Sequence, residues 1–148
     1  MEFIKNILKD KNTAFYVALS FAALSLITGI VYIASCLKID GATVLPMVFM
    51  LLAGILFAGL SVLGLTKAGA VAMGLMSFAA FGALLVNVAP YVVGAFQNMA
   101  MTGFDLSKVE GFPAIVVSAV LMLVCAISGN VFAYIGFEKK VKEGEDNV

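Results

Sequence analysis

Four long segments without a charged side chain dominate this sequence: residues 12–37, 41–66, 68–104 and 111–137 contain no Asp, Glu, Lys or Arg. An α-helix rises about 1.5 Å per residue, so about 20 apolar residues cross a hydrocarbon core that is roughly 30 Å thick. Each of the four segments exceeds this length. We therefore predict an all-α integral membrane protein, a four-helix bundle.

The chain is too short to hold a soluble domain of ordinary size beside four spans, so we expect one membrane domain over residues 1–148. The expected spans are 13–36, 46–65, 69–96 and 113–137, followed by a charged tail at 138–148. Residues 1–12 have two interpretations. The spacing of their apolar residues suits a short helix in the headgroup region, but so short a segment also fits a polar leader.

All nine basic residues are lysines, and their distribution predicts the orientation. Lys38 and Lys108 lie on one side of the predicted bundle, and the other seven lysines, at positions 5, 9, 11, 67, 139, 140 and 142, lie on the opposite side. Because lysine-rich loops stay on the cytoplasmic side, we expect both chain ends there. This bias, with the absence of Arg, suggests a bacterial cytoplasmic membrane. The net charge of zero argues against a nucleic-acid partner.

The two cysteines do not suggest a disulfide. Cys36 ends the first span, whereas Cys125 lies about 18 Å deep in the fourth, too far apart for the Cα separation of about 7 Å that a disulfide permits. We interpret both as small buried side chains. A second interpretation of Cys36 stays open, because Ile33-Ala34-Ser35 before it fits a bacterial lipoprotein signal with Cys36 lipidated after cleavage. The long uncharged segment before it favours a retained span.

Prolines mark two helix starts and one interruption. Pro46 and Pro113 suit the first turns of spans two and four. Pro90 lies inside the third uncharged segment, where it removes a backbone hydrogen bond, so span three is expected to kink at residues 86–90 or to end near Phe96. The recurrence of Ser-Phe-Ala-Ala at 20–23 and 77–80 raises the hypothesis of a parallel two-plus-two repeat, although so short a match also arises by chance.

Small residues spaced three or four apart predict where the helices touch, because membrane helices associate where small side chains let the backbones approach. The expected packing positions are Gly29, Gly54, Ala58, Gly74, Gly82 and Gly129. We assign most of these stripes to contacts within the bundle. A stripe that is not used there would contact another copy of the chain or another membrane protein.

Five polar residues of the spans are candidates for a ligand contact or a solute pathway: Ser25, Thr28, Asn87, Tyr91 and Asn130. The structural interpretation is that their hydrogen bonds hold the helices in register. For a ligand, the best single candidate is Asn87 with Tyr91 and the carbonyl that Pro90 leaves without its usual partner.

The spans contain no His, Arg, Lys or carboxylate, so no pair of a nucleophile and a base can be assembled in them. We expect no enzyme and no cofactor, and we interpret Asp40, Asp105 and Glu110 as solvated loop charges, not a metal site. The favoured function is an accessory or assembly subunit of a larger membrane complex, or a homo-oligomer. The alternative is a channel or facilitator for a small solute, lined by Ser, Thr, Asn and Tyr.

Overall fold

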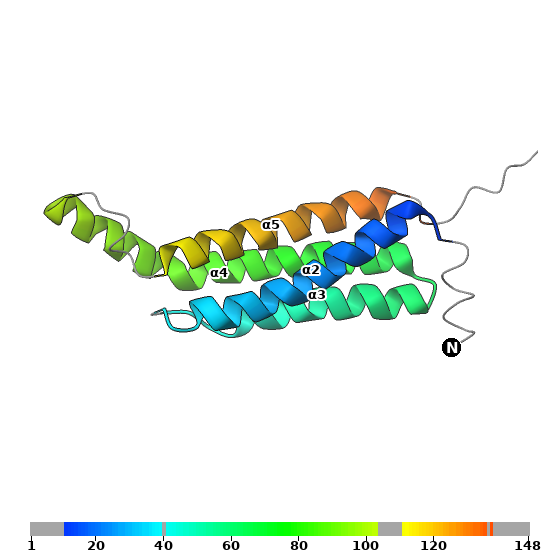
Figure 1. Ribbon diagram of the computed structural model, residues 1–148, viewed down its shortest axis with the longest axis horizontal. Helices are drawn as coiled ribbons and strands as arrows, with labels where there is room; N and C mark the ends of the chain where they lie inside the picture. Colours follow the sequence, from blue (N-terminus) through cyan, green and yellow to red (C-terminus); the bar gives the residue numbers. More distant parts are fainter. Residues whose placement is uncertain (1–10, 40, 104–110, 136, 138–148) are drawn as a thin grey trace, which may run out of the picture.

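The computed structural model describes residues 11–39, 41–103, 111–135 and 137, and 86% of these are helical with no strand among them. The helices are α2 (Thr13–Cys36), α3 (Leu45–Val62), α4 (Thr66–Thr102) and α5 (Phe112–Tyr134), which lie roughly side by side (Figure 1). All four are long and apolar enough to cross a membrane. The all-α class and the four-helix bundle of membrane-spanning length are confirmed.

Local sequence explains where the helices begin. The Asn12 side chain accepts a hydrogen bond from the Phe15 backbone N–H at 3.2 Å and so caps α2. Pro46 and Pro113 lie in the first turns of α3 and α5, where a missing N–H costs nothing. Between α3 and α4, Gly64 takes a left-handed φ of 80°, which glycine adopts without strain.

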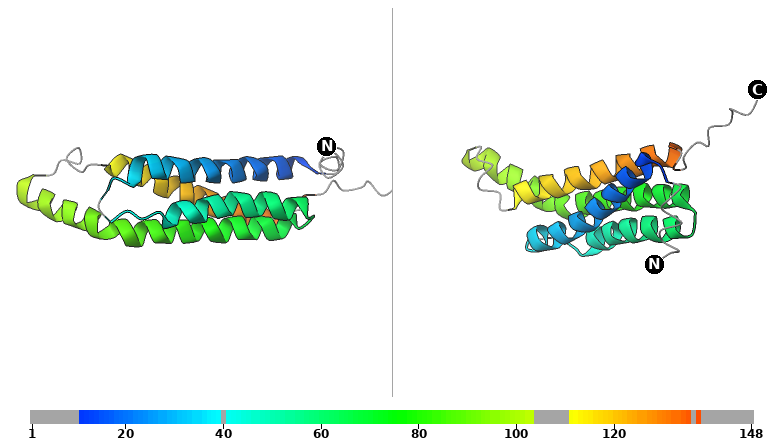
Figure 2. Two further views of the ribbon diagram at one scale, coloured as in Figure 1. Left: turned by 90° about the horizontal axis from the view of Figure 1, so that it is seen from below. Right: turned by 45° about the vertical axis from the view of Figure 1, so that its right-hand side comes forward.

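Helix α4 continues through Pro90 to Thr102, so it does not end near Phe96. The ribbon instead bends in the second half of α4, and its last turns leave the bundle (Figures 1 and 2). A proline removes one hydrogen bond from a helix without ending it when the flanking residues can still pair. The bend is the expected consequence, and the remaining turns continue as helix.

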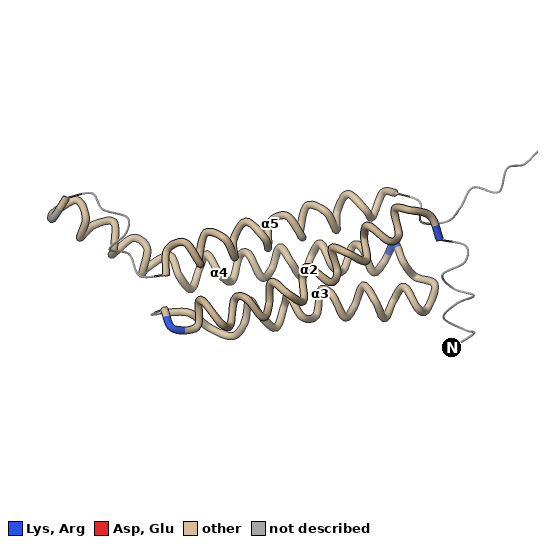
Figure 3. The backbone as a smooth tube through the Cα atoms, in the orientation of Figure 1, with Lys and Arg blue, Asp and Glu red and all other residues tan. Residues whose placement is uncertain are grey.

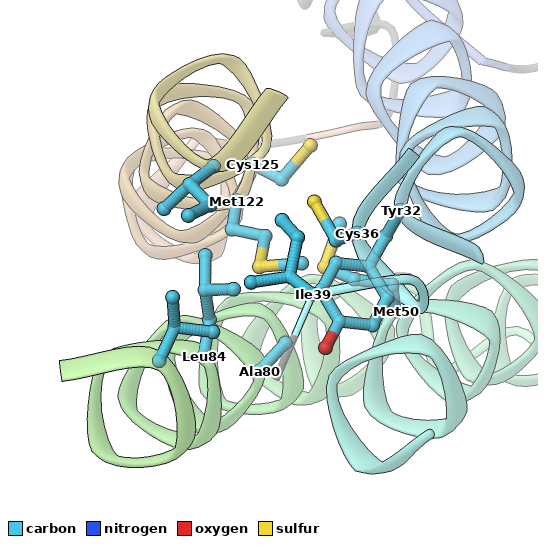
Figure 4. Packing of buried hydrophobic residues seen from close by; sticks show 10 residues of the cluster. Tyr32, Cys36, Ile39, Met50, Ala80, Leu84, Met122 and Cys125 are labelled. Atoms are coloured by element: carbon cyan, nitrogen blue, oxygen red, sulfur yellow. The ribbon is translucent and has the colours of Figure 1, made fainter. Parts of the chain in front are cut away.

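The four helices pack as a closed ring. Helix α2 contacts α3 and α5, and α4 contacts the same two helices from the other side, whereas α2 and α4 barely touch (Figure 2). The interior divides into two apolar clusters along the bundle. One holds Phe15, Ala18, Ala22, Ala53, Phe57, Ala70, Met73, Phe132 and Phe137. The other holds Tyr32, Cys36, Ile39, Met50, Ala80, Leu84, Val88, Ile115, Met122 and Cys125 (Figure 4).

The described lysines separate between the two ends of the bundle (Figure 3). Lys11 Nζ lies 3.5 Å from Thr66 Oγ1, which brings the start of α2 to the start of α4, next to Lys67. The Asn12 N–H donates to the Phe137 carbonyl at 3.1 Å, which places the chain after α5 there too. We call this end the Lys67 end. Lys38 follows α2 at the opposite end, which we call the Gly41 end after the connection between α2 and α3.

Several sequence predictions fall on residues that the structure does not describe. They are the short helix or polar leader at 1–10, the acidic residues Asp40, Asp105 and Glu110, the tail at 138–148, and the lysines at 5, 9, 108, 139, 140 and 142.

Candidate functional site

A pocket of about 500 Å³ lies at the Gly41 end, where α4 bends. It is lined by Gly41, Asn87, Pro90, Tyr91, Gly94, Ala95 and Asn98. Two of the five polar candidates from the sequence, Asn87 and Tyr91, therefore share one wall with the proline that was expected beside them. Pockets that bind small molecules commonly have volumes of about 300–1,000 Å³, so this one is large enough for a ligand.

One face of α4 forms one wall of the pocket. Asn87, Tyr91, Gly94 and Asn98 recur every three or four residues, so they lie on one face of α4. Gly41 contributes from the facing connection, with a φ of 86°. A Cβ on Gly41 would lie 2.6 Å from the Asn87 carbonyl oxygen, so only glycine fits this close approach.

Thr43, in the connection between α2 and α3, forms hydrogen bonds with side chains of α4 and α2. Asn87 Nδ2 donates to Thr43 Oγ1 at 2.7 Å, and Tyr32 Oη donates to the Thr43 carbonyl at 2.8 Å. Tyr32 is fully buried, so its ring anchors the second of these bonds within the apolar cluster of Figure 4. The two bonds fix the connection against α2 and α4 and thereby hold the pocket walls in place.

Among the described residues, the pocket lining is polar and contains no Asp, Glu, Lys, Arg or His. Asn87, Asn98 and Tyr91 supply two amides and a phenol, and the other lining residues are glycine, alanine or proline. A Cβ added to Gly94 would meet no atom within 4 Å, so this glycine leaves open space. The spacing of 87, 91 and 94 was visible in the sequence, and its continuation to Asn98 was missed.

The structure places the other three polar candidates elsewhere. Ser25 and Thr28 are buried inside the bundle, where their hydroxyls donate to backbone carbonyls of their own helix at 2.7 and 2.8 Å. Asn130 is exposed on α5, and its Nδ2 donates to the Ala126 carbonyl at 2.9 Å. These three residues do not meet Asn87 and Tyr91 at one site.

The predicted packing residues also divide into two groups. A Cβ on Gly54 would lie 2.7 Å from the Leu26 side chain, one on Gly29 would lie 3.5 Å from Leu51, and Gly74 and Gly129 face each other. These four lie at contacts between helices. Ala58 is exposed, and a Cβ on Gly82 would meet nothing within 4 Å, so these two lie on open sides of the bundle.

Two buried serines were not among the candidate site residues from the sequence. Ser61 Oγ and Ser77 Oγ have no hydrogen-bond partner among the described residues, and Ser77 is fully buried. Cys36 and Cys125 are free and fully buried, and Cys36 Sγ lies 3.5 Å from Ser118 Oγ. The sequence could have indicated the two serines, because a small hydroxyl residue on an inward helical face often carries a buried polar atom.

Comparison with models of known protein families, with curated proteins and with solved structures finds no match to this chain.

Proposed function

We propose that this protein is a non-enzymatic integral membrane subunit that works by binding another membrane protein or further copies of itself. The four apolar helices fit a small membrane protein. The uncharged spans contain no Asp, Glu, His, Lys or Arg to act as an acid or base within the membrane. A role in association or assembly needs only a surface.

The observation that carries the proposal is a pair of small residues on the outside of α3. Ala58 and Gly59 are exposed, and a Cβ on Gly59 would meet no atom within 4 Å. Ile55 and Val62, one turn to either side, are 58% and 49% exposed, so the small pair forms a notch between larger apolar side chains. Notches of this kind let a second membrane helix approach closely.

Association can be measured on the protein in lipid nanodiscs by native mass spectrometry and by identifying the proteins that co-purify in mild detergent. Ala58→Leu and Gly59→Leu fill the notch and are expected to remove a defined oligomer or a stoichiometric partner. Ala23→Leu is the matched control, because Ala23 is exposed on α2, away from the notch. A parent protein that is strictly monomeric and free of partners would refute the proposal.

The second candidate is a channel or facilitator, and the uncharged pocket with Asn87 and Tyr91 favours it. A pathway through a single bundle would have to pass Tyr32, Met50 and Phe57, which are fully buried in the interior. The pathway in this hypothesis therefore runs between subunits. Uptake of a small neutral solute into proteoliposomes that is lost in Asn87→Leu would support it, and uptake unaffected by this change would remove the named site.

The orientation belongs to the same proposal. Both chain ends lie in the cytoplasm and the Gly41 end faces outward, in a bacterial cytoplasmic membrane. Lys11 and Lys67 at one end of the bundle support this, because lysines accumulate on the cytoplasmic side.

A further inference from the structure

We propose that the pocket at the bend of α4 binds an uncharged, hydroxyl-bearing group, such as a sugar. Three observations carry this inference: the chemistry of the lining, the rigidity of the walls and the position of the pocket along the bundle.

The lining residues that the structure describes carry no charged side chain. Asn87, Tyr91 and Asn98 are the polar side chains among the seven described lining residues, and none of the seven is Asp, Glu, Lys, Arg or His. An ion that entered would lose hydration without gaining an opposite charge from these walls. A hydroxyl group both donates and accepts hydrogen bonds, and so does a side-chain amide. Asn87 uses one hydrogen on Thr43, and an amide offers two hydrogens and two lone pairs, so capacity for a ligand remains.

Hydrogen bonds and close contacts hold part of the pocket wall in place. Asn87 donates a hydrogen bond to the Thr43 hydroxyl, and the buried Tyr32 donates one to the Thr43 carbonyl. Gly41 lies in close contact with the Asn87 backbone. Tyr91 packs against the apolar cluster that contains Tyr32. A preformed site spends less binding energy on ordering side chains.

The pocket also lies at a depth that such a ligand can reach. Helix α2 ends at Cys36 and α3 begins at Leu45, so Gly41 lies in the connection at the end of two spans, at the level of lipid headgroups. A sugar can reach this level in two ways, as the headgroup of a glycolipid or as a free solute from the water.

Gly94 gives a selective way to block the pocket. A Cβ on Gly94 meets nothing within 4 Å, so the larger side chain of Gly94→Leu can enter the pocket that Gly94 lines. Gly82→Leu is the matched control, because Gly82 lies on the same helix, a Cβ there would also meet nothing within 4 Å, and Gly82 is not among the described lining residues. Elution volume and helical circular dichroism should match the parent in both variants.

The lipid source is tested by native mass spectrometry of the protein in nanodiscs that contain glucosyl diacylglycerol or, in a second series, anionic phosphatidylglycerol. The free source is tested by saturation-transfer NMR with methyl glucoside. We expect a bound sugar in at least one of these experiments, weakened on the order of tenfold or more in Gly94→Leu and retained in Gly82→Leu. Added salt should leave the affinity unchanged, because an uncharged ligand is not screened.

Three results would overturn the proposal. The first is that neither glucosyl diacylglycerol nor methyl glucoside binds. The second is that the parent and the Gly94→Leu protein bind the sugar equally well. The third is a salt-sensitive preference for phosphatidylglycerol that Gly94→Leu removes, which would show that the pocket accepts a charged headgroup.

Discussion

Gly129 of α5 lies directly against Gly74 of α4, so closely that a Cβ on Gly129 would be 2.6 Å from the Gly74 Cα. On the opposite side of the contact, a Cβ on Gly74 would lie 3.0 Å from the Asn130 backbone nitrogen. All three nearest neighbours of a Cβ on Gly129 are backbone atoms, of Gly74 and Ala70, so no side chain there can move aside. The close packing of α4 against α5 therefore depends on both glycines.

Gly129→Ala should destabilise the bundle by about 1–3 kcal/mol, because the added methyl group forces the two backbones apart. The measurement is the unfolding free energy in mixed detergent micelles. Gly82→Ala is the control, since its methyl group meets nothing within 4 Å and should leave stability unchanged or slightly raised. Equal stability of the Gly129→Ala protein and the parent would contradict the close contact.

Tyr32→Phe should loosen the connection between α2 and α3. The change removes the hydrogen bond from Tyr32 Oη to the Thr43 carbonyl, a loss of about 1 kcal/mol. Hydrogen exchange measured by mass spectrometry should become faster at residues 41–44 and stay the same in the turn at Gly64. Tyr134→Phe, which alters a side chain that is 90% exposed, should change neither.

Ser77→Ala should stabilise the protein by about 1–2 kcal/mol, because it removes a fully buried hydroxyl that has no partner among the described residues. Ser118→Ala is the comparison. That change removes the contact with Cys36 and should give no such gain. Unfolding curves of the two variants in the same detergent decide the matter, and a loss of stability in Ser77→Ala would mean that its hydroxyl binds an interior group such as water.

Thiol labelling tests the orientation. In a protein with Cys36→Ala and Cys125→Ala, we expect Lys38→Cys to react with a membrane-impermeant maleimide on intact cells. Lys67→Cys should react only after the cells are opened. Both lysines are exposed at opposite ends of the bundle, so access depends only on the side of the membrane. Labelling of both positions from outside would exclude the proposed topology.

The charge distribution was enough to predict the number and type of the helices in the part of the chain that the structure describes. Lys67 and the other charged residues lie between or beside the uncharged spans because charged residues are costly within lipid. The exact ends of the helices were harder to predict. Helix α3 ends at Val62 and α4 begins at Thr66, whereas the expected spans ended at 65 and began at 69. The turn is built on Gly64 instead, and in so apolar a stretch only its positive φ distinguishes this glycine from its neighbours.

The site was only partly accessible from the sequence. Asn87, Tyr91 and Pro90 could be grouped because they share one helix and lie one turn apart. Gly41 could not be added, because its contact with Asn87 joins residues that are distant in the chain. Nor does periodicity alone distinguish a glycine that admits another helix, such as Gly74, from one that leaves open space, such as Gly94.

The unequal lengths of α3 and α4 make the two ends of the molecule unlike each other. Helix α4 has 37 residues, roughly 55 Å, whereas α3 has 18, roughly 27 Å. The surplus projects beyond the Gly41 end as a bent arm (Figure 2). Two copies inserted in the same direction would carry their arms on one membrane face, where the arms can meet. Copies inserted in opposite directions would hold them apart, on either side of the bilayer.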